Sequence, residues 1–323
     1  MTFPKVTVLV TVKNSEQNIE KCVNSLLKLN YPNYKIYITD AFSTDKTYEI
    51  LKKIQSKYPK KIKIEQIRGN ISKALNYMIK KVKSEFIAIT DADCVVDKNW
   101  LKNLILGFDS NEIISTAGFC STKKNVNKLQ RLIGLELENR FKHFPKFITR
   151  APTMNFCVKT YFAKKVKFDE RLDVAQETDW GYRLTKLGKI KYVPNAVVYH
   201  YHRTELKSYF KQQFEYGKNV PLVYLIKHRN KIIGDHISTP TVFFQLLFFN
   251  FNVLLFLISI FFRQIVFQSF LFFIFLLSFY LFDIIIITKS PKEILSLLFI
   301  YFFRVTAWTL GIAVGLIKLL LNR

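Results

Sequence analysis

Three long apolar segments near the carboxyl end of the chain place the tightest limit on how it can fold. They comprise residues 242–262, 265–288 and 294–321. Each has about 20 residues or more, enough for a helix to span a hydrocarbon layer of roughly 30 Å. A helix in a soluble core would carry polar residues on one face, and these segments carry almost none. The sequence therefore predicts three transmembrane helices, joined by short polar turns at residues 263–264 and 289–292.

The charge of the chain changes at the same boundary. The formal net charge is +25 although half of the residues are hydrophobic, and most of the basic residues lie before Pro240. Anionic lipid headgroups attract a basic surface of this kind, and so do phosphorylated substrates. Nucleic acid is not predicted as a partner, because the sequence shows no recognition helix, zinc-ligand spacing or aromatic RNA-binding pattern.

The amino-terminal part is predicted to lie on the cytoplasmic face of a membrane. Its first apolar stretch, Val6–Val12, is too short for the core of a signal peptide and is typical of a strand. The excess of basic residues before the spans favours the same orientation. Four widely separated cysteines lack metal-ligand spacing and are expected to be buried, reduced thiols; they are Cys22, Cys94, Cys120 and Cys157. We therefore expect an integral, multi-pass membrane protein.

Strand and helix patterns alternate through the amino-terminal third. Strands are predicted at Val6–Val12, Tyr34–Asp40 and residues 62–67 and 86–90, and helices at residues 16–29, 44–58 and 72–81. This alternation predicts a parallel sheet with helices on both faces. Beyond it lie an amphipathic stretch at residues 126–141, a helix at 180–187 and closing strands at 190–192 and 196–201. The predicted fold class is α/β, followed by an all-α transmembrane region.

Polar residues follow the predicted strands at the points where the strands end. They are Lys13, Asn14, Asp40, Gly69, Asn70, Asp91 and Asp93. Parallel sheets bind ligands outside these carboxyl ends, so we expect one polar rim. Asp91 and Asp93 are one residue apart, and in an extended chain their side chains point to the same side. Such a pair is half of a Mg²⁺ or Mn²⁺ site completed by substrate phosphates, although a plain polar turn shows the same pattern.

Several segments, taken in order, resemble the family 2 glycosyltransferases of the GT-A fold. They read VLVTVKNSEQNIEKCVNSLL, YPNYKIYITDAFSTDKT, RGNISKALN, ITDADCVVDKNWL, FDERLDVAQETDWGYRLTKLGKIKYVPNAVVYHYHR and FKQQFEYGK. The resemblance implies a GT-A catalytic domain with a Rossmann-like, mostly parallel sheet at residues 1–205. We expect an amphipathic interfacial segment at residues 206–239 and a membrane domain at residues 240–323.

The resemblance also implies a nucleoside-diphosphate-sugar donor and assigns residues to it. Glu16 is placed near the ribose or base, Asp40 receives the nucleobase, and Asp91 and Asp93 hold a divalent cation on the diphosphate, with His200 completing the metal shell. The implied donor site consists of Thr11, Lys13, Asn14, Glu16, Asp40, Gly69, Asn70, Lys73, Asn76 and Asp91. A packed aromatic ladder around His200 is the alternative reading.

The segment Gln176-Glu177-Thr178-Asp179 occupies the place of the family's catalytic acidic motif, which often reads Glu-Asp-x-Asp. In that register Glu177 stands where the family has an aspartate that takes the acceptor proton. Asp179 stays an alternative base. Acids also favour the amino-terminal turn of a helix because of its dipole, so the pair has a purely structural reading. In two further departures, Thr11 stands where many members have proline, and Ala41 and Phe42 replace a small polar pair.

A last group of residues is assigned to the acceptor side or to support of the site. It comprises Trp180, Arg183, His202, Gln213 and Lys218. Arg183 is expected to pair with Glu177 or Asp179 rather than to bind phosphate.

Two charged residues lie within the apolar segments. Asp283 and Arg304 are costly there, and we expect them to pair with one another. Contact between Arg304 and an acceptor phosphate is the alternative.

The resemblance and the apolar segments together predict a membrane-anchored, inverting glycosyltransferase with a lipid-linked or cell-surface glycan acceptor. A catalytically weak nucleotide-sugar-binding scaffold is one alternative. A processive polysaccharide synthase is another, but its usual Gln-x-x-Arg-Trp element is replaced by residues 212–216. A transporter or pore is disfavoured, because the spans lack polar residues.

Overall fold

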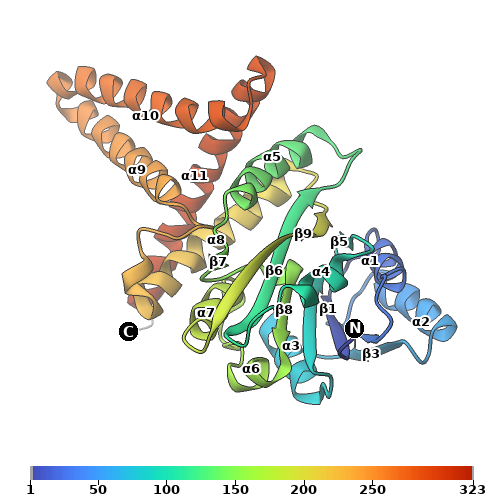
Figure 1. The fold of residues 1–323 in the computed structure, drawn as a ribbon. Helices are drawn as coiled ribbons and strands as arrows, with labels where there is room; N and C mark the ends of the chain where they lie inside the picture. The colour runs from blue at the N-terminus through green and yellow to red at the C-terminus, as the bar shows by residue number, and fades with distance from the viewer. Residues whose placement is uncertain (1–2, 322–323) are drawn as a thin grey trace. The chain divides into compact units, whose positions relative to one another are not determined.

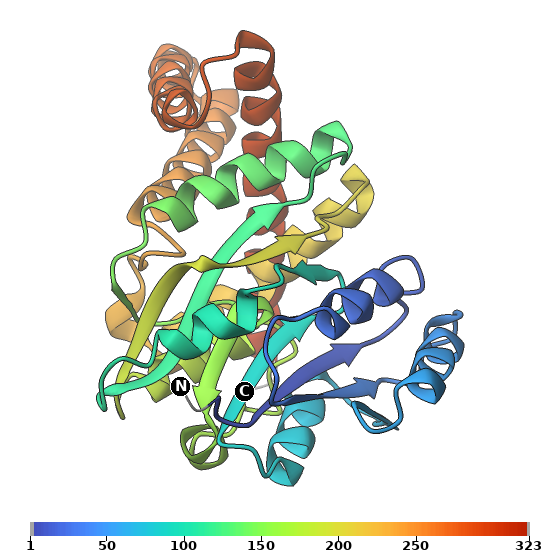
Figure 2. The same ribbon diagram turned by 45° about the vertical axis from the view of Figure 1, so that its right-hand side comes forward.

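A computed structural model describes residues 3–321, which form two compact units. The first unit contains residues 1–126 and 140–202, and the second contains residues 127–139 and 203–323. Helix α5, Lys128–Lys142, contributes residues to both units. Figures 1 and 2 show the elements of each unit.

Four parallel strands build one half of the sheet in the first unit. They are β1 (Val6–Val12), β2 (Tyr34–Asp40), β3 (Ile62–Gln66) and β4 (Phe86–Asp91), in the order β3-β2-β1-β4 (Figure 2). Helices α1 (Ile19–Leu27), α2 (Thr47–Lys57) and α3 (Ile71–Lys81) connect them. Val12 pairs with Asp40, and Thr11 pairs with Asp91. The predicted alternation is confirmed, and its register brings the polar strand ends to one edge.

The second half of the sheet mixes directions. Strand β8 (Phe156–Lys159) runs antiparallel to both β4 and β6 (Ile113–Thr122). Strand β9 (Lys189–His200) is parallel to β6, and β5 (Cys94–Val96) and β7 (Phe147–Ile148) are antiparallel to β9. Helices α4 (Trp100–Leu106), α6 (Thr160–Lys165) and α7 (Gln176–Leu184) and the turn η1 (Thr153–Asn155) complete the unit.

The two predicted closing strands are one strand of 12 residues, β9. The register shifts between Gly118 and Phe119, which pair with Val193 and Val197. Pro194 lies within this irregular stretch, where proline is tolerated because no ladder hydrogen bond is needed from its nitrogen. The strand therefore continues to His200.

The core of the first unit fills both faces of the sheet. Val8, Leu9 and Val10 point to alternating faces and have no exposed surface, as expected for a strand covered on both sides. All four cysteines are buried free thiols, as predicted. Burial raises the pKa of the thiols of Cys22 and Cys157, so these thiols stay protonated and unreactive.

The second unit contains four long helices. They are α8 (Leu206–Lys227), α9 (Pro240–Phe261), α10 (Val266–Ile287) and α11 (Pro291–Leu321), with short turns at η2 (Arg229–Lys231) and η3 (Arg263–Ile265) (Figure 1). The last three helices are long and apolar enough to cross a membrane. Large apolar side chains point outward from them; Phe261 is 81% exposed and Phe282 is 71% exposed.

Helix α8 packs closely along α11 through glycines. A Cβ atom on Gly311 would lie 2.3 Å from the carbonyl oxygen of Phe214, and one on Gly217 would lie 2.4 Å from that of Trp308. The Trp308 indole N–H donates to Gln213 Oε1 at 3.1 Å. Gln213 is thus a buried packing residue of this helix pair. A contact between Gln213 and an acceptor stays a prediction.

Lys218 is likewise occupied within α8. Its Nζ lies 3.1 Å from Glu215 Oε2, one helical turn earlier. Neighbours three residues apart on a helix face each other, so this pair is local. Contact between Lys218 and an acceptor stays a prediction.

A buried polar network links α5 to the apolar helices of the second unit. Arg304 is 4% exposed and donates from Nη1 to the carboxylate of Glu136 and from Nη2 to Gln245 Oε1 at 3.3 Å. Asp283 Oδ2 accepts from Gln245 Nε2 and from the Tyr301 hydroxyl, both at 3.1 Å. The expected direct pairing of Arg304 with Asp283 is therefore wrong. Gln245 lies between them, and the counter-charge comes from α5.

Replacing Glu136 with glutamine is expected to destabilise the second unit by about 3–5 kcal/mol, because a buried guanidinium would lose its counter-charge. Thermal unfolding in detergent measures the loss. The matched control is Arg131→Gln, which breaks the exposed pair between Arg131 and Glu293 of the same unit and should change stability by only about 0–1 kcal/mol. Equal losses in the two variants would contradict a special role for the buried pair.

Candidate active site

The acidic edge of the sheet is built where β4 and β9 end. Asp91 is the last residue of β4, and Asp93 follows it. The pairing of β5 with β9 sets Cys94 opposite His200, and His200 Nε2 lies 3.3 Å from Asp93 Oδ1. One ligand atom each from Asp93, Cys94 and His200 lies within 4.8 Å of the others. The structure thus brings together Asp93 and His200, as the predicted metal shell requires.

The charges at this edge are unbalanced. Burial, together with the negative charges of Asp93 and Glu177, raises the pKa of the Asp91 carboxyl to about 7, while His200 acts in the opposite direction. Crowded carboxylates that resist ionisation are relieved by a nearby cation.

The donor atoms fit a hard divalent cation. Carboxylate oxygens suit Mg²⁺ and Mn²⁺, and an imidazole is compatible with Mn²⁺. Burial and the adjacent carboxylates raise the pKa of the Cys94 thiol well above its usual range. It therefore stays neutral and is a poor ligand. Asp91, Asp93 and His200 are the residues that could hold such an ion.

The His202 ring contacts the ring of His200. Their Nδ1 atoms are 3.0 Å apart, and His202 Nε2 lies 3.2 Å from Thr122 Oγ1. Burial and the neighbouring His200 lower the pKa of His202 to about 3. A neutral, buried imidazole in this position orients His200. A role for His202 on the acceptor side stays a prediction.

The two candidate bases, Glu177 and Asp179, both lie on helix α7 but have different surroundings. It starts after Ala175, whose φ is 63°. Asp179 is 1% exposed, and its Oδ2 accepts from Arg183 Nε at 2.9 Å and Nη2 at 2.6 Å. Arg183 thus pairs with Asp179, one of the two partners expected for it. Glu177 is half-buried, and burial raises the pKa of its carboxyl. The charge of Glu177 contributes to the raised pKa of Asp91.

Arg150 is a site residue that sequence reasoning missed. It is 5% exposed, its Nη1 donates to Thr178 Oγ1 at 3.2 Å, and its charge acts on Glu177. Gly181 allows the approach, since a Cβ there would lie 2.5 Å from Arg150 Cβ. The only sequence signal is one basic residue before an apolar stretch.

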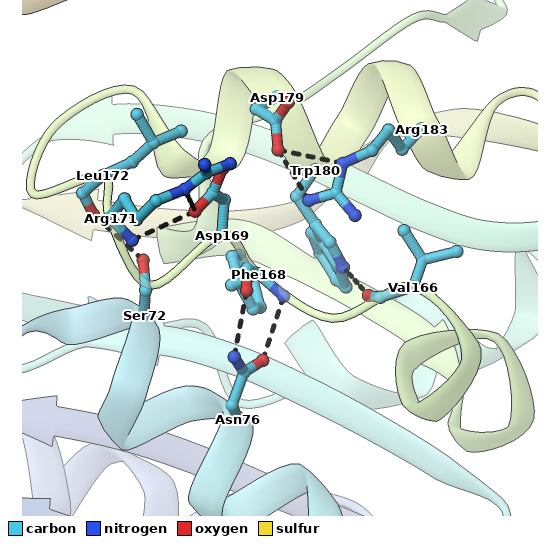
Figure 3. A network of polar contacts seen from close by, with 10 residues as sticks. All are labelled: Ser72, Asn76, Val166, Phe168, Asp169, Arg171, Leu172, Asp179, Trp180 and Arg183. Carbon is cyan, nitrogen blue, oxygen red and sulfur yellow. Dashed lines mark hydrogen bonds and ion pairs between the residues drawn. The ribbon is translucent and has the colours of Figure 1, made fainter.

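Asn76 fastens the loop that leads into α7, as Figure 3 shows. Its amide donates to the Phe168 carbonyl at 3.0 Å and to Glu170 Oε1 at 2.9 Å, and its oxygen accepts from the Phe168 N–H at 2.9 Å. Trp180 stacks on Phe168 with ring centroids 4.2 Å apart and donates to the Val166 carbonyl. Trp180 is therefore a core residue that supports the loop, and a direct contact with an acceptor stays a prediction. Asn76 acts on the site through the loop.

Replacing Asn76 with alanine is expected to destabilise the protein by about 1–3 kcal/mol, because backbone groups of the loop lose their partner. We expect kcat to fall as well, since the loop positions α7. Thermal unfolding and initial rates measure the two effects. Asn24→Ala, at an exposed position of α1, is the control and should change neither. A variant as stable and active as the wild type would remove Asn76 from the support of the site.

The loops after β1 and β2 are tied to each other at the nucleotide edge. The Asn14 N–H donates to Ser43 Oγ at 2.9 Å, and Asn14 Oδ1 accepts from the Thr44 N–H at 2.8 Å. Glu16 Oε2 accepts from the Lys46 N–H at 3.0 Å. Lys13 is exposed beside them. Asn14 and Glu16 thus shape the edge, and contact with a nucleotide stays a prediction.

The loop after β3 closes the other side of the rim. Gly69 has a φ of 131°, which favours glycine. Asn70 caps α3 by accepting from the Lys73 N–H at 3.0 Å, and it donates to Asp173 Oδ1 at 2.8 Å. Lys73 is exposed. These residues reach the expected edge, and their roles toward a donor stay predictions.

Comparison with known proteins gives a consistent result. Residues 7–172 match the family model described as Glycosyl transferase family 2. Over 118 residues the chain is 36% identical to a beta-monoglucosyldiacylglycerol synthase of Nostoc sp., a match that covers 35% of this chain and 25% of that protein. Over 235 residues it is 26% identical to a dolichyl N-acetyl-alpha-D-glucosaminyl phosphate 3-beta-D-2,3-diacetamido-2,3-dideoxy-beta-D-glucuronosyltransferase of Methanococcus voltae, covering 66% of this chain and 71% of that protein.

The fold also has a solved counterpart. A mannosyltransferase from Pyrobaculum calidifontis, in complex with GDP-Man and Mn²⁺, is similar with a TM-score of 0.58 at 15% identity. The similarity covers 71% of this chain and 65% of that chain. It confirms the predicted GT-A fold class.

Proposed function

The chain belongs to glycosyl transferase family 2, and from this premise we propose that it is a membrane-anchored, inverting glycosyltransferase. It transfers a sugar from a nucleoside diphosphate to a lipid-linked or cell-surface glycan acceptor. One observation supports the proposal: Asp93 and His200, from distant parts of the chain, lie 3.3 Å apart at the edge of the sheet where β4 ends with Asp91. A donor diphosphate needs this collection of groups.

A divalent cation held by Asp91, Asp93 and His200 would supply charge neutralisation for the leaving diphosphate. The Mn²⁺ bound to the similar mannosyltransferase supports this assignment. His202 keeps the imidazole of His200 in place through the Nδ1 contact. Thr11 lies next to Asp91 in the sheet, at the edge that the donor reaches.

Glu177 is the proposed general base. It removes the proton of the acceptor hydroxyl while that oxygen attacks the anomeric carbon from the face opposite the diphosphate. A single displacement of this kind inverts the configuration. The raised pKa of Glu177 brings its basicity closer to neutral pH, where general bases work best. Asp179 and Arg183 fix the helix that presents it.

The second unit provides the proposed membrane attachment. Helices α9, α10 and α11 are long and apolar enough to span a bilayer, and their outward phenylalanines and leucines suit contact with acyl chains. The chain spans about a quarter of the length of the Nostoc relative, whose name specifies a lipid product. That name and the dolichyl phosphate in the name of the Methanococcus protein support a lipid-linked acceptor. The basic head favours a multi-pass arrangement with the catalytic unit on the cytoplasmic face.

A donor screen tests the proposal. Purified full-length protein is incubated with UDP- and GDP-sugars and a polyprenyl phosphate or diacylglycerol acceptor, with Mn²⁺ or with EDTA. We expect transfer with at least one donor, dependent on the cation. Binding of donors without hydrolysis or transfer would instead favour the scaffold alternative, and failure to bind any nucleotide sugar would overturn both.

A further inference from the structure

Aromatic side chains line an open cavity beside strands β6 and β9 of the first unit. The cavity has a volume of about 490 Å³, and its apolar lining includes Phe119, Phe141, Phe144 and Tyr192. These residues all belong to the first unit, and none is assigned to the donor, the cation or the base. Binding sites for small molecules have volumes of roughly 300–1,000 Å³, so the cavity is large enough for a ligand.

The cavity lies at the irregularity in the sheet. The pairing of β9 with β6 stops at Val193 and resumes at Val197, and Pro194, between them, lines the cavity. Residues that leave a ladder in this way bend a strand. The Tyr192 N–H donates to the Lys146 carbonyl at 2.9 Å, and β7 continues from there along β9 (Figure 1). The backbone therefore holds both sides of the cavity in place.

The aromatic rings of the lining contact one another in series. The ring centroids of Phe119 and Phe141 are 6.0 Å apart, those of Phe141 and Phe144 4.7 Å, and those of Phe144 and Tyr192 5.3 Å. The Tyr192 hydroxyl is buried and has no hydrogen-bond partner within residues 3–321. Burial raises the pKa of this hydroxyl, so it stays protonated. The lining thus offers apolar faces and one unused donor.

Two exposed lysines add positive charge to this lining. Lys142 is the last residue of α5 and Lys146 precedes β7, and both line the cavity. Among the residues that the structure describes, Lys142 has no ion pair. The charge of Lys146 acts on Asp109, whose carboxylate already pairs with Lys191. Basic pockets of this kind bind anionic lipid headgroups, so the charge selects an anionic ligand.

We propose that this cavity binds an anionic phospholipid, with an acyl chain against the aromatic rings and the phosphate at Lys142 and Lys146. A phospholipid matches both parts of the lining, because its chain is apolar and its headgroup is negative. A free phosphate or a sugar would leave the rings without a partner. The inference goes beyond the proposed function and takes from it only the membrane attachment, which brings such lipids to the protein.

Photocrosslinking of lipids to the purified full-length protein in detergent tests the site. Phosphatidylglycerol and phosphatidylcholine each carry a diazirine on the acyl chain, and mass spectrometry maps the labelled peptides. We expect phosphatidylglycerol to label residues 141–146 and 192–194 and phosphatidylcholine to label them much less. Labelling confined to α9, α10 and α11 would overturn the inference. Equal labelling of the cavity by both lipids would also overturn it, since the groove would then suit another apolar partner.

The double variant Lys142→Gln/Lys146→Gln tests the charge. The phosphatidylglycerol concentration that gives half-maximal labelling of the cavity should rise by roughly ten- to thirtyfold. The matched control is Lys57→Gln/Lys60→Gln, which removes two exposed lysines of the same unit and should leave that concentration unchanged. An equal rise in the control would show that only the overall charge matters, and would overturn the site.

The variant Tyr192→Phe tests the unused donor. Its unfolding temperature without lipid should equal or exceed that of the wild type, because the lost hydroxyl is buried without a partner. Half-maximal labelling should need about two- to tenfold more phosphatidylglycerol. Wild-type labelling in both this variant and the double lysine variant would overturn the inference. A protein that is labelled at the cavity but transfers no sugar would contradict only the proposed function.

Discussion

The variant Glu177→Gln is expected to lose about 10²- to 10⁴-fold in kcat, the usual contribution of a general base. Glutamine matches glutamate in shape but cannot accept the proton of the acceptor hydroxyl. Glu177 is half-buried and interacts electrostatically with Asp91, so the variant should fold and bind the donor normally. Initial rates at saturating acceptor, with donor KM and unfolding temperature, measure the three effects.

Asp179→Asn is the matched comparison. Its carboxylate is buried and bound by Arg183, so we expect mainly a loss of stability. Since Arg183 is partly exposed, that loss should be about 1–2 kcal/mol. If Asp179→Asn loses the kcat and Glu177→Gln keeps it, the two carboxylates have exchanged roles.

The pH profile gives an independent check on Glu177. Burial raises the pKa of its carboxyl, and a base acts only when deprotonated. The rate should therefore fall as the pH decreases through this raised pKa, at a pH above the ordinary glutamate value of about 4.3. The Glu177→Gln variant should lack this acidic limb in its residual activity. If the rate of the variant still falls in the same way as the pH decreases, a group other than Glu177 causes the pH dependence.

The second large effect is expected from Asp93→Ala, with a loss of transfer on the order of 10²- to 10³-fold, because several kcal/mol of charge stabilisation depend on the cation. Asp93 lies 3.3 Å from His200 and is partly exposed, so the fold should survive its removal. When rates are measured against Mn²⁺ concentration, the Asp93→Ala variant should need more of the ion than the wild type to reach half of its maximal rate. Chelation with EDTA should abolish wild-type transfer, and added Mn²⁺ should restore it.

Glu112→Gln controls for the loss of a carboxylate. Glu112 is exposed and pairs with Lys189 at 2.8 Å, at the end of β9 opposite His200. Its substitution should change neither the rate nor the cation requirement. If the Asp93→Ala variant has the same rate and the same response to the cation as the wild type, Asp93 is not a ligand of the metal.

Local patterns explain which parts of the site could be predicted from the sequence. Asp91 and Asp93 follow a strand pattern, and Asp179 and Arg183 are four residues apart on a helix, where side chains meet. The approach of His200 to Asp93 is different. It depends on the pairing of β5 with β9, which no local pattern encodes, and only the resemblance to a family suggested it.

The contacts that the sequence did not predict share a physical cause. Trp180, Gln213 and Arg304 are amphipathic or polar residues whose contacts depend on the element that packs against them. Trp180 faces Phe168 in the core, Gln213 faces Trp308, and Arg304 meets Glu136 from a distant helix. A sequence shows the chemical type of such side chains but not the neighbours that satisfy them.

Helix α11 has a consequence for the order of assembly during synthesis. It supplies the glycine surface for α8 and the guanidinium for Glu136, although both partners precede it by many residues. On the ribosome, α8 and Glu136 of α5 must therefore remain without their final contacts until α11 emerges. The sheet of the first unit has no such delay, so this unit can fold before α11 is synthesised.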